Sequence, residues 1–116
     1  GYDERIQREV LVLGGGDRQH ILKTANETRI MAAHYNKLSP EQKTVVDETL
    51  ARMEPLNHAT ALRKLGASGR ILMINAEKDR VIAPECTSKL ARALGVEKDV
   101  VWLEGLGHYT AMAALL

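Results

Sequence analysis

Large aromatic side chains are nearly absent from this sequence. It contains no phenylalanine, and tyrosine and tryptophan bring the aromatic content to only 3%. Aromatic residues usually contribute the largest buried areas of a core, so a core here must be built from aliphatic side chains. The single cysteine, Cys86, excludes an intrachain disulfide and a zinc site built on paired cysteines.

An excess of charge of one sign is also lacking, because 16 Lys and Arg residues face 15 Asp and Glu residues. The net charge of +1 argues against a nucleic-acid partner, which needs a concentrated basic face. The longest apolar runs, 10–13 and 71–74, have the length of strands. A membrane partner is not expected, because a spanning helix requires ~20 apolar residues. With 116 residues, 45% of them hydrophobic, the chain should form one folded domain.

Three short apolar segments predict β-strands, over residues 9–13, 70–76 and 99–103. The first ends at three consecutive glycines and the third is followed closely by Gly105. Continuous apolar runs of this length, bounded by glycine, are typical of parallel strands that are buried on both faces.

Helical patterns fill the segments between and after these strands. Five helices are expected, over residues 17–35, 40–54, 56–65, 85–94 and 109–116. Asp17 is placed to cap the first helix, and Ser39 begins the second with the pattern of a capping box. Gly66 and Gly95 are expected to end the helices that they follow.

Strands that alternate with helices predict an α/β fold, with a three-stranded parallel sheet and right-handed crossover helices. Two of three strands would be sheet edges, which makes such a sheet poorly stable alone. The chain also begins at Gly1, without methionine or a signal-peptide pattern. We therefore expect either part of a larger domain or a unit that pairs with another copy of itself.

Residues whose side chains can take part in proton transfer follow the second and third predicted strands. Asp79 comes after the strand at 70–76, and His108 comes after the strand at 99–103. Neighbouring parallel strands lie about 4.8 Å apart, and their carboxyl ends share one edge of the sheet. We therefore expect the carboxylate to accept the proton on one imidazole nitrogen, which leaves the other nitrogen as a general base. Alone, Asp79 could equally be a residue of a turn.

Residues 70–110 resemble the end of the α/β-hydrolase fold, most closely the dienelactone hydrolase and acetyl xylan esterase-like branches. Asp79, followed by Ile82 and Pro84, is similar to the family's acid motif, and a Gly-x-Gly turn leads into His108 as in the family. The resemblance implies that Asp79 and His108 are the acid and the base of a Ser-His-Asp triad acting on small carboxylic esters.

The resemblance also implies a domain organisation. Residues 1–116 would be a partial α/β-hydrolase domain, in which residues 10–13 correspond to the sixth strand. Residues 17–65 would be a helical cap-like insertion over the active site. Residues 70–116 would be a unit of strand, acid, helix, strand and histidine.

The sequence departs from the family in lacking the nucleophile. A G-x-S-x-G elbow should precede the acid and the histidine, but the only serines are Ser39, Ser68 and Ser88, and none stands in an elbow. The glycine that many relatives place shortly before the acid is missing as well. The nucleophile is therefore expected on a missing N-terminal half of the domain, and the isolated chain is expected to be inactive.

Two alternatives stay open. The chain could be a non-catalytic α/β scaffold that self-associates through its sheet, as a homo-oligomer. Residues 14–17 could also bind a nucleotide phosphate at a helix start, although they match no phosphate-binding motif.

The remaining candidate residues have simpler interpretations. His20, close behind the glycines, is a candidate for lining a substrate pocket. Cys86 is expected to be a small helix residue and Trp102 a core residue. His34 and His58 have no ligand spacing, so neither a metal nor another cofactor is expected.

Overall fold

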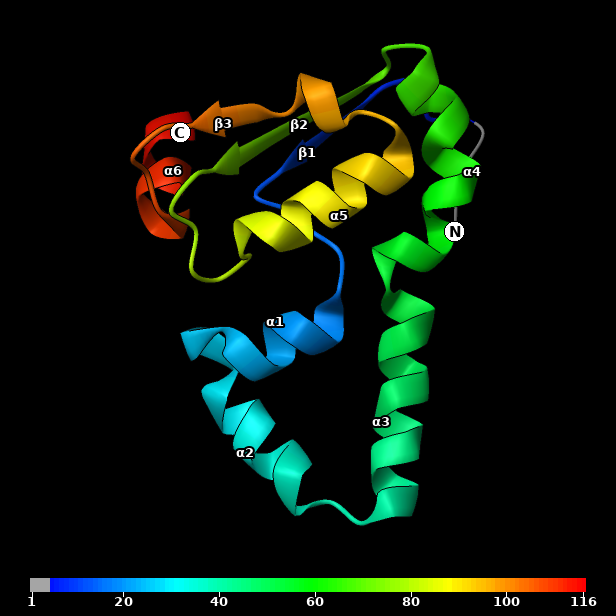
Figure 1. The fold of residues 1–116 in the computed structure, drawn as a ribbon, viewed down its shortest axis with the longest axis vertical. Coiled ribbons are helices and arrows are strands. Elements are labelled where there is room, and N and C mark those ends of the chain that lie inside the picture. The colour runs from blue at the N-terminus through cyan, green and yellow to red at the C-terminus, as the bar shows by residue number, and fades with distance from the viewer. Residues whose placement is uncertain (1–4) are drawn as a thin grey trace.

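The computed structural model describes residues 5–116 and confirms the α/β class with a three-stranded parallel sheet (Figure 1). The strands β1 (Glu9–Val12), β2 (Ile71–Ala76) and β3 (Val101–Leu103) lie in that order and pair in parallel. The helices are α1 (Arg18–Thr24), α2 (Arg29–Lys37), α3 (Pro40–Met53), α4 (Pro55–Ala67), α5 (Pro84–Leu94) and α6 (His108–Leu115), with 3-10 turns η1 (Asn26–Thr28) and η2 (Glu97–Asp99). No helix in this part of the chain is both long and apolar enough to cross a membrane.

The core lies between the sheet and the two helices α4 and α5, and it is aliphatic, as the composition requires (Figure 1). Met73 of β2 and Leu94 of α5 are fully buried at its centre. Trp102, which the sequence suggested as a core residue, is only partly buried, because β3 is an edge strand. Gly95 ends α5 in a left-handed conformation with φ of 77°, as predicted.

The expectation that the strands are buried on both faces is wrong. Val10 and Val12 are 58% and 47% exposed, and Leu72 and Val101 are exposed as well. Helices α5 and α6 both contact β2, but the exposure of Val10, Val12, Leu72 and Val101 leaves part of the sheet surface open. An apolar run signals burial of a strand but does not tell whether one or both faces are covered.

The predicted helix over 17–35 is broken into α1, η1 and α2. Ala25 has an extended backbone, with φ of −72° and ψ of 136°, and ends α1. The Thr28 hydroxyl then lies 2.8 to 3.0 Å from three carbonyl oxygens of the preceding turn, and its one proton can be donated to any of them. The next helix, α3, begins with the predicted capping box of Ser39 and Gln42 and ends before Pro55.

Helices α1, α2 and α3 form an arm that extends away from the sheet, with α1 and α2 as one limb and α3 as the other (Figure 1). None of these three helices contains a buried residue. Helix α4 differs, because its residues Ala59 and Leu65 belong to the core. The segment that stands apart from the sheet therefore ends with α3, before the limit at residue 65 that the resemblance implied.

Gly66 does not end α4, because the helix continues to Ala67. A Cβ atom on Gly66 would lie 2.1 Å from the backbone oxygen of Leu94. Glycine is needed inside this helix because α4 approaches the end of α5 so closely, and not because the chain turns there.

Polar contacts anchor the arm at its root. Asp17 has a left-handed backbone and caps α1 by accepting a hydrogen bond from the His20 N–H. The Glu54 carboxylate accepts the backbone N–H groups of Asp17 and Arg18, at 3.0 and 2.7 Å. The Asp17 carboxylate also pairs with the Lys89 ammonium of α5. This bond to Lys89 holds the pKa of the Asp17 carboxyl below its ordinary value.

Lys89→Gln should therefore destabilise the protein at neutral pH, and the loss should fade in acid. Asp17 has a lower pKa folded than unfolded, so its contribution is present above about pH 4 and is lost as the pH falls through the folded pKa. Urea unfolding of both proteins between pH 7 and pH 2 measures the difference. Lys64→Gln is the control, because Lys64 makes no ion pair in residues 5–116. An equal loss at every pH would contradict the role of Asp17.

Candidate acid–histidine site

The loops that follow β2 and β3 are bonded to each other directly beyond the sheet. Ala76 pairs with Leu103 at the ends of the two strands. The Lys78 N–H then donates to the Leu106 carbonyl at 2.8 Å, and the Glu77 carboxylate accepts the Gly105 N–H at 2.8 Å. These bonds continue the strand pairing into the loops, so the loops keep a fixed separation.

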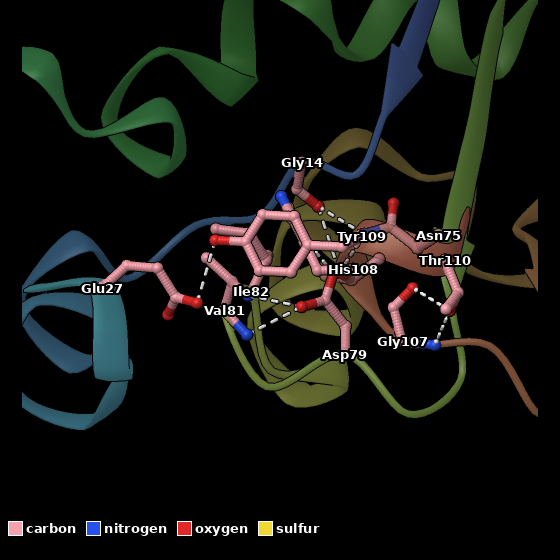
Figure 2. Close-up of polar contacts among 11 residues, drawn as sticks. Gly14, Glu27, Asn75, Asp79, Val81, Ile82, Gly107, His108, Tyr109 and Thr110 are labelled. Atoms are coloured by element: carbon pink, nitrogen blue, oxygen red, sulfur yellow. Dashed lines mark hydrogen bonds and ion pairs between the residues drawn. The ribbon is translucent and has the colours of Figure 1, made fainter. Parts of the chain in front are cut away.

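Asp79 occupies the first of these loops, and its side chain has no exposed surface. One oxygen, Oδ1, accepts the backbone N–H groups of Val81 and Ile82, at 2.8 and 2.9 Å. The other oxygen, Oδ2, lies 2.8 Å from Nδ1 of His108 (Figure 2). The prediction that the two strands bring Asp79 and His108 into hydrogen-bonding contact is confirmed.

His108 is the first residue of α6, and the Gly-x-Gly sequence before it has a structural reason. Gly105 adopts a left-handed backbone with φ of 71°, which favours glycine. A Cβ atom on Gly107 would lie 3.4 Å from the Lys78 carbonyl oxygen, so the two loops approach closely there. The Thr110 hydroxyl accepts the Gly107 N–H at 2.9 Å and secures the first turn of α6. The imidazole is thus held at the sheet edge, with 16% of its side chain exposed.

The geometry determines which imidazole nitrogen is available for chemistry. A carboxylate can only accept, so the contact with Asp79 requires a proton on Nδ1 of His108. In the neutral ring the lone pair is then on Nε2, the nitrogen that can take a proton from a nucleophile. Within residues 5–116, no side chain or backbone group hydrogen-bonds to Nε2. The ring of Tyr109 packs edge-on against the imidazole, with centroids 5.3 Å apart.

A pocket of about 280 Å³ opens beside His108. Its walls come from η1, from the loop that carries Asp79 and from the start of α6. Across it, the Tyr109 hydroxyl donates a hydrogen bond of 3.0 Å to the Glu27 carboxylate of η1 (Figure 2). This bond raises the pKa of Tyr109, since ionisation would remove the donor. The two residues are 82 positions apart, and no local pattern in the sequence links them.

His20, the candidate pocket residue, does not join this site. It belongs to α1, its Nε2 lies 3.6 Å from the Glu85 carboxylate, and it does not line the pocket beside His108. Cys86 is fully buried in α5, as expected of a small helix residue, and burial raises the pKa of its thiol. A raised thiol pKa opposes the formation of a nucleophilic thiolate.

The glycines after β1 have packing reasons of their own. A Cβ atom on Gly15 would lie 2.7 Å from the Ile82 side chain, and one on Gly16 would lie 2.5 Å from the Leu56 side chain. The Gly14 carbonyl accepts hydrogen bonds from the buried side chains of Asn75 and Thr87. Close packing therefore accounts for this turn without a bound phosphate.

Other catalytic groups are not assembled around His108 in residues 5–116. Ser39 caps α3, Ser68 donates to the Leu65 carbonyl, and Ser88 lies within α5. The same residues contain no cluster of three or more His, Cys, Asp or Glu side chains that could hold a metal ion. No protein-family model, curated protein or solved structure matches the chain.

Asp79→Asn should reverse the tautomer of His108. The amide oxygen is expected to stay on the N–H groups of Val81 and Ile82, which turns the amide NH2 towards Nδ1. Nδ1 must then accept, and the proton moves to Nε2. A charge-assisted hydrogen bond contributes about 1.5 kcal/mol or more. The ratio of Nδ1-protonated to Nε2-protonated His108 should therefore differ by more than about tenfold between wild type and Asp79→Asn. Nitrogen-15 NMR of the imidazole measures this ratio.

Asp99→Asn is the matched control for this measurement, because Asp99 is exposed on η2 and does not contact His108. A wild-type ring that is protonated mainly on Nε2 would show that the bond between Asp79 and His108 is not formed in solution.

Proposed function

We propose that this chain carries the acid and the base of a serine hydrolase that acts on small carboxylic esters, with Asp79 as the acid and His108 as the base. The observation that carries the proposal is the contact of 2.8 Å between Asp79 Oδ2 and His108 Nδ1, made by a carboxylate without exposed surface. The resemblance of residues 70–110 to the α/β-hydrolase fold supports the same assignment.

The nucleophile is a serine outside these 116 residues, on the N-terminal half of the domain. The resemblance places its strand next to β1, and the outer edge of β1 pairs with no strand in residues 5–116. A parallel strand added there would end at the same sheet edge as β2 and β3. A serine that follows such a strand would lie on the side of the sheet edge where His108 is held.

The reaction then has two halves. In the first, His108 Nε2 takes the proton of the serine hydroxyl as its oxygen bonds to the ester carbonyl carbon, and Asp79 stabilises the imidazolium. The imidazolium returns the proton to the leaving alkoxide as the carbon–oxygen bond of the ester breaks, and an acyl-enzyme remains. In the second half, water gives a proton to Nε2 as its oxygen bonds to the acyl carbon. The imidazolium then returns this proton to the serine oxygen as the bond between that oxygen and the acyl carbon breaks, which releases the acid and restores the serine.

The test uses a longer polypeptide, which consists of Gly1–Leu116 and the residues that the same reading frame encodes before Gly1. It should hydrolyse p-nitrophenyl acetate, and Asp79→Asn should lower kcat on the order of 10⁴-fold. His108→Ala should lower kcat at least as much, because it removes the base itself. The 116-residue chain alone should be inactive and should not react with a fluorophosphonate, which labels activated serines.

Asp47→Asn of α3 is the control in this assay. Within residues 5–116, the Asp47 carboxylate accepts its side-chain hydrogen bonds from Gln19 and Tyr35, which belong to the arm. Equal rates for wild type and His108→Ala, or an upstream frame without a G-x-S-x-G elbow, would refute the proposal.

A second candidate function, a self-associating scaffold, is favoured by the uncovered face of the sheet. Val10 pairs with Leu72, and Val12 lies level with Ile74 and Val101, so these uncharged side chains form one surface. The chain exposes 7846 Å², whereas a compact monomer of this mass exposes about 6,300 Å². The excess is larger than the roughly 800 Å² that each partner buries in a standard interface.

Sedimentation of the 116-residue chain tests the scaffold function. A scaffold should form dimers whose population rises with concentration, and Val10→Lys should make it monomeric, because a buried lysine without a partner is costly. Val45→Lys is the control, since Val45 is 63% exposed on α3, away from the sheet. Wild-type protein that stays monomeric at high concentration would exclude this function.

A further inference from the structure

Within residues 5–116, one side-chain hydrogen bond joins the arm to the residues around His108. Glu27 lies in η1, directly after α1, and accepts the hydrogen bond from Tyr109, the residue next to His108 (Figure 2). Residues of η1 and residues around His108 line the same pocket. The contact therefore joins two walls of one pocket, which come from opposite ends of the chain.

Within residues 5–116, the other side-chain hydrogen bonds of η1, made by the Thr28 hydroxyl, stay inside the arm. Helices α1, α2 and α3 contain no buried residue, and Ala25, between α1 and η1, is the buried side chain nearest to Glu27 in the sequence. The contacts at the root of the arm hold only the start of α1. Lys89 pairs with Asp17, which precedes this helix, and Glu54 accepts the N–H groups of Asp17 and Arg18. A segment with few buried contacts opens easily, so the contact at the end of α1 has a strong effect on the position of η1.

We propose that Tyr109 and Glu27 form a latch that holds η1 over His108, and that the latch sets how large a substrate group can reach Nε2. Tyr109 is a positioning residue with two contacts: its ring packs against the imidazole, and its hydroxyl holds the arm. A tyrosine hydroxyl is protonated and can donate at neutral pH, and the hydrogen bond to Glu27 raises the pKa of Tyr109 further. The contact between Tyr109 and Glu27 does not depend on the proposed function. Only the identity of the group that enters the pocket, part of an ester, rests on that function.

Chemical modification of His108 in the 116-residue chain tests the latch. Diethyl pyrocarbonate acylates accessible imidazoles, and mass spectrometry assigns the rate to each histidine. Tyr109→Phe keeps the ring and removes only the hydroxyl, so modification of His108 should become about fivefold faster, as expected for a change near 1 kcal/mol. Glu27→Ala should have the same effect, and Glu27→Gln, which keeps an acceptor, a smaller one.

The double variant Tyr109→Phe/Glu27→Ala should react no faster than either single variant, because both remove the same bond. Tyr35→Phe is the matched control: the Tyr35 hydroxyl donates to the Asp47 carboxylate within the arm, at 2.9 Å. It should leave His108 unchanged, and the exposed His34 should react at one rate in all variants.

Unchanged modification of His108 in both single variants would overturn the latch, and so would an equal acceleration in Tyr35→Phe, which would indicate general loosening of the arm. In the longer polypeptide, Tyr109→Phe should lower the KM of bulky p-nitrophenyl esters with little change in kcat for p-nitrophenyl acetate. If that polypeptide is inactive while His108 modification responds as expected, the proposed hydrolase function fails and the latch stands.

Discussion

The contact between Asp79 and His108 depends on the parallel pairing of β2 with β3. Because Ala76 lies level with Leu103, both strands end at the same edge of the sheet, and the loops that follow begin side by side. An antiparallel β3 would have delivered its following loop to the opposite edge of the sheet. The hydrogen bond from Lys78 to Leu106 extends the pairing by one step, so the site takes its geometry from the sheet register.

The buried carboxylate of Asp79 bonds both to its own turn and to His108, so the turn does not account for all of its contacts. Burial of a carboxylate is costly unless hydrogen bonds replace its hydration. Two of those bonds come from Val81 and Ile82 and form the turn after β2. They use only Oδ1, and a residue of a turn needs nothing more. The second oxygen contacts Nδ1 of His108, a hydrogen bond that the turn itself does not need.

Features that follow from short-range rules could be predicted from the sequence. The capping box at Ser39 and the glycine end of α5 at Gly95 each depend on a few adjacent residues. The Asp79–His108 contact spans a longer separation, but it follows from the rule that parallel strands share their carboxyl edge. In each case a known geometry, a helix cap or a pair of parallel strands, connects the residues. Their positions in the sequence are therefore enough to predict the contact.

Features that depend on the surroundings of a segment could not be predicted. The break at Ala25 interrupts a helical pattern that continues beyond it, and Gly66 has the sequence signal of a helix end although it lies inside α4. Its true constraint is the backbone of Leu94, which only the packing of α4 on α5 brings near. The bond between Glu27 and Tyr109 is of the same kind, since it exists only because the arm folds back to the sheet edge.

The two sides of the pocket differ in how firmly they are held. Asp79 lies in the loop after β2, and His108 begins α6 directly after the loop that follows β3. These two loops are bonded to each other, so the relative position of the two residues depends on the pairing of β2 with β3. The wall from η1 is held by a hydrogen bond at the surface, which contributes about 1 kcal/mol or less because water competes for both partners. Local opening should therefore start in the arm and leave the contact between Asp79 and His108 intact. The pocket beside His108 can thus change its shape on the side of η1 while this contact keeps its geometry.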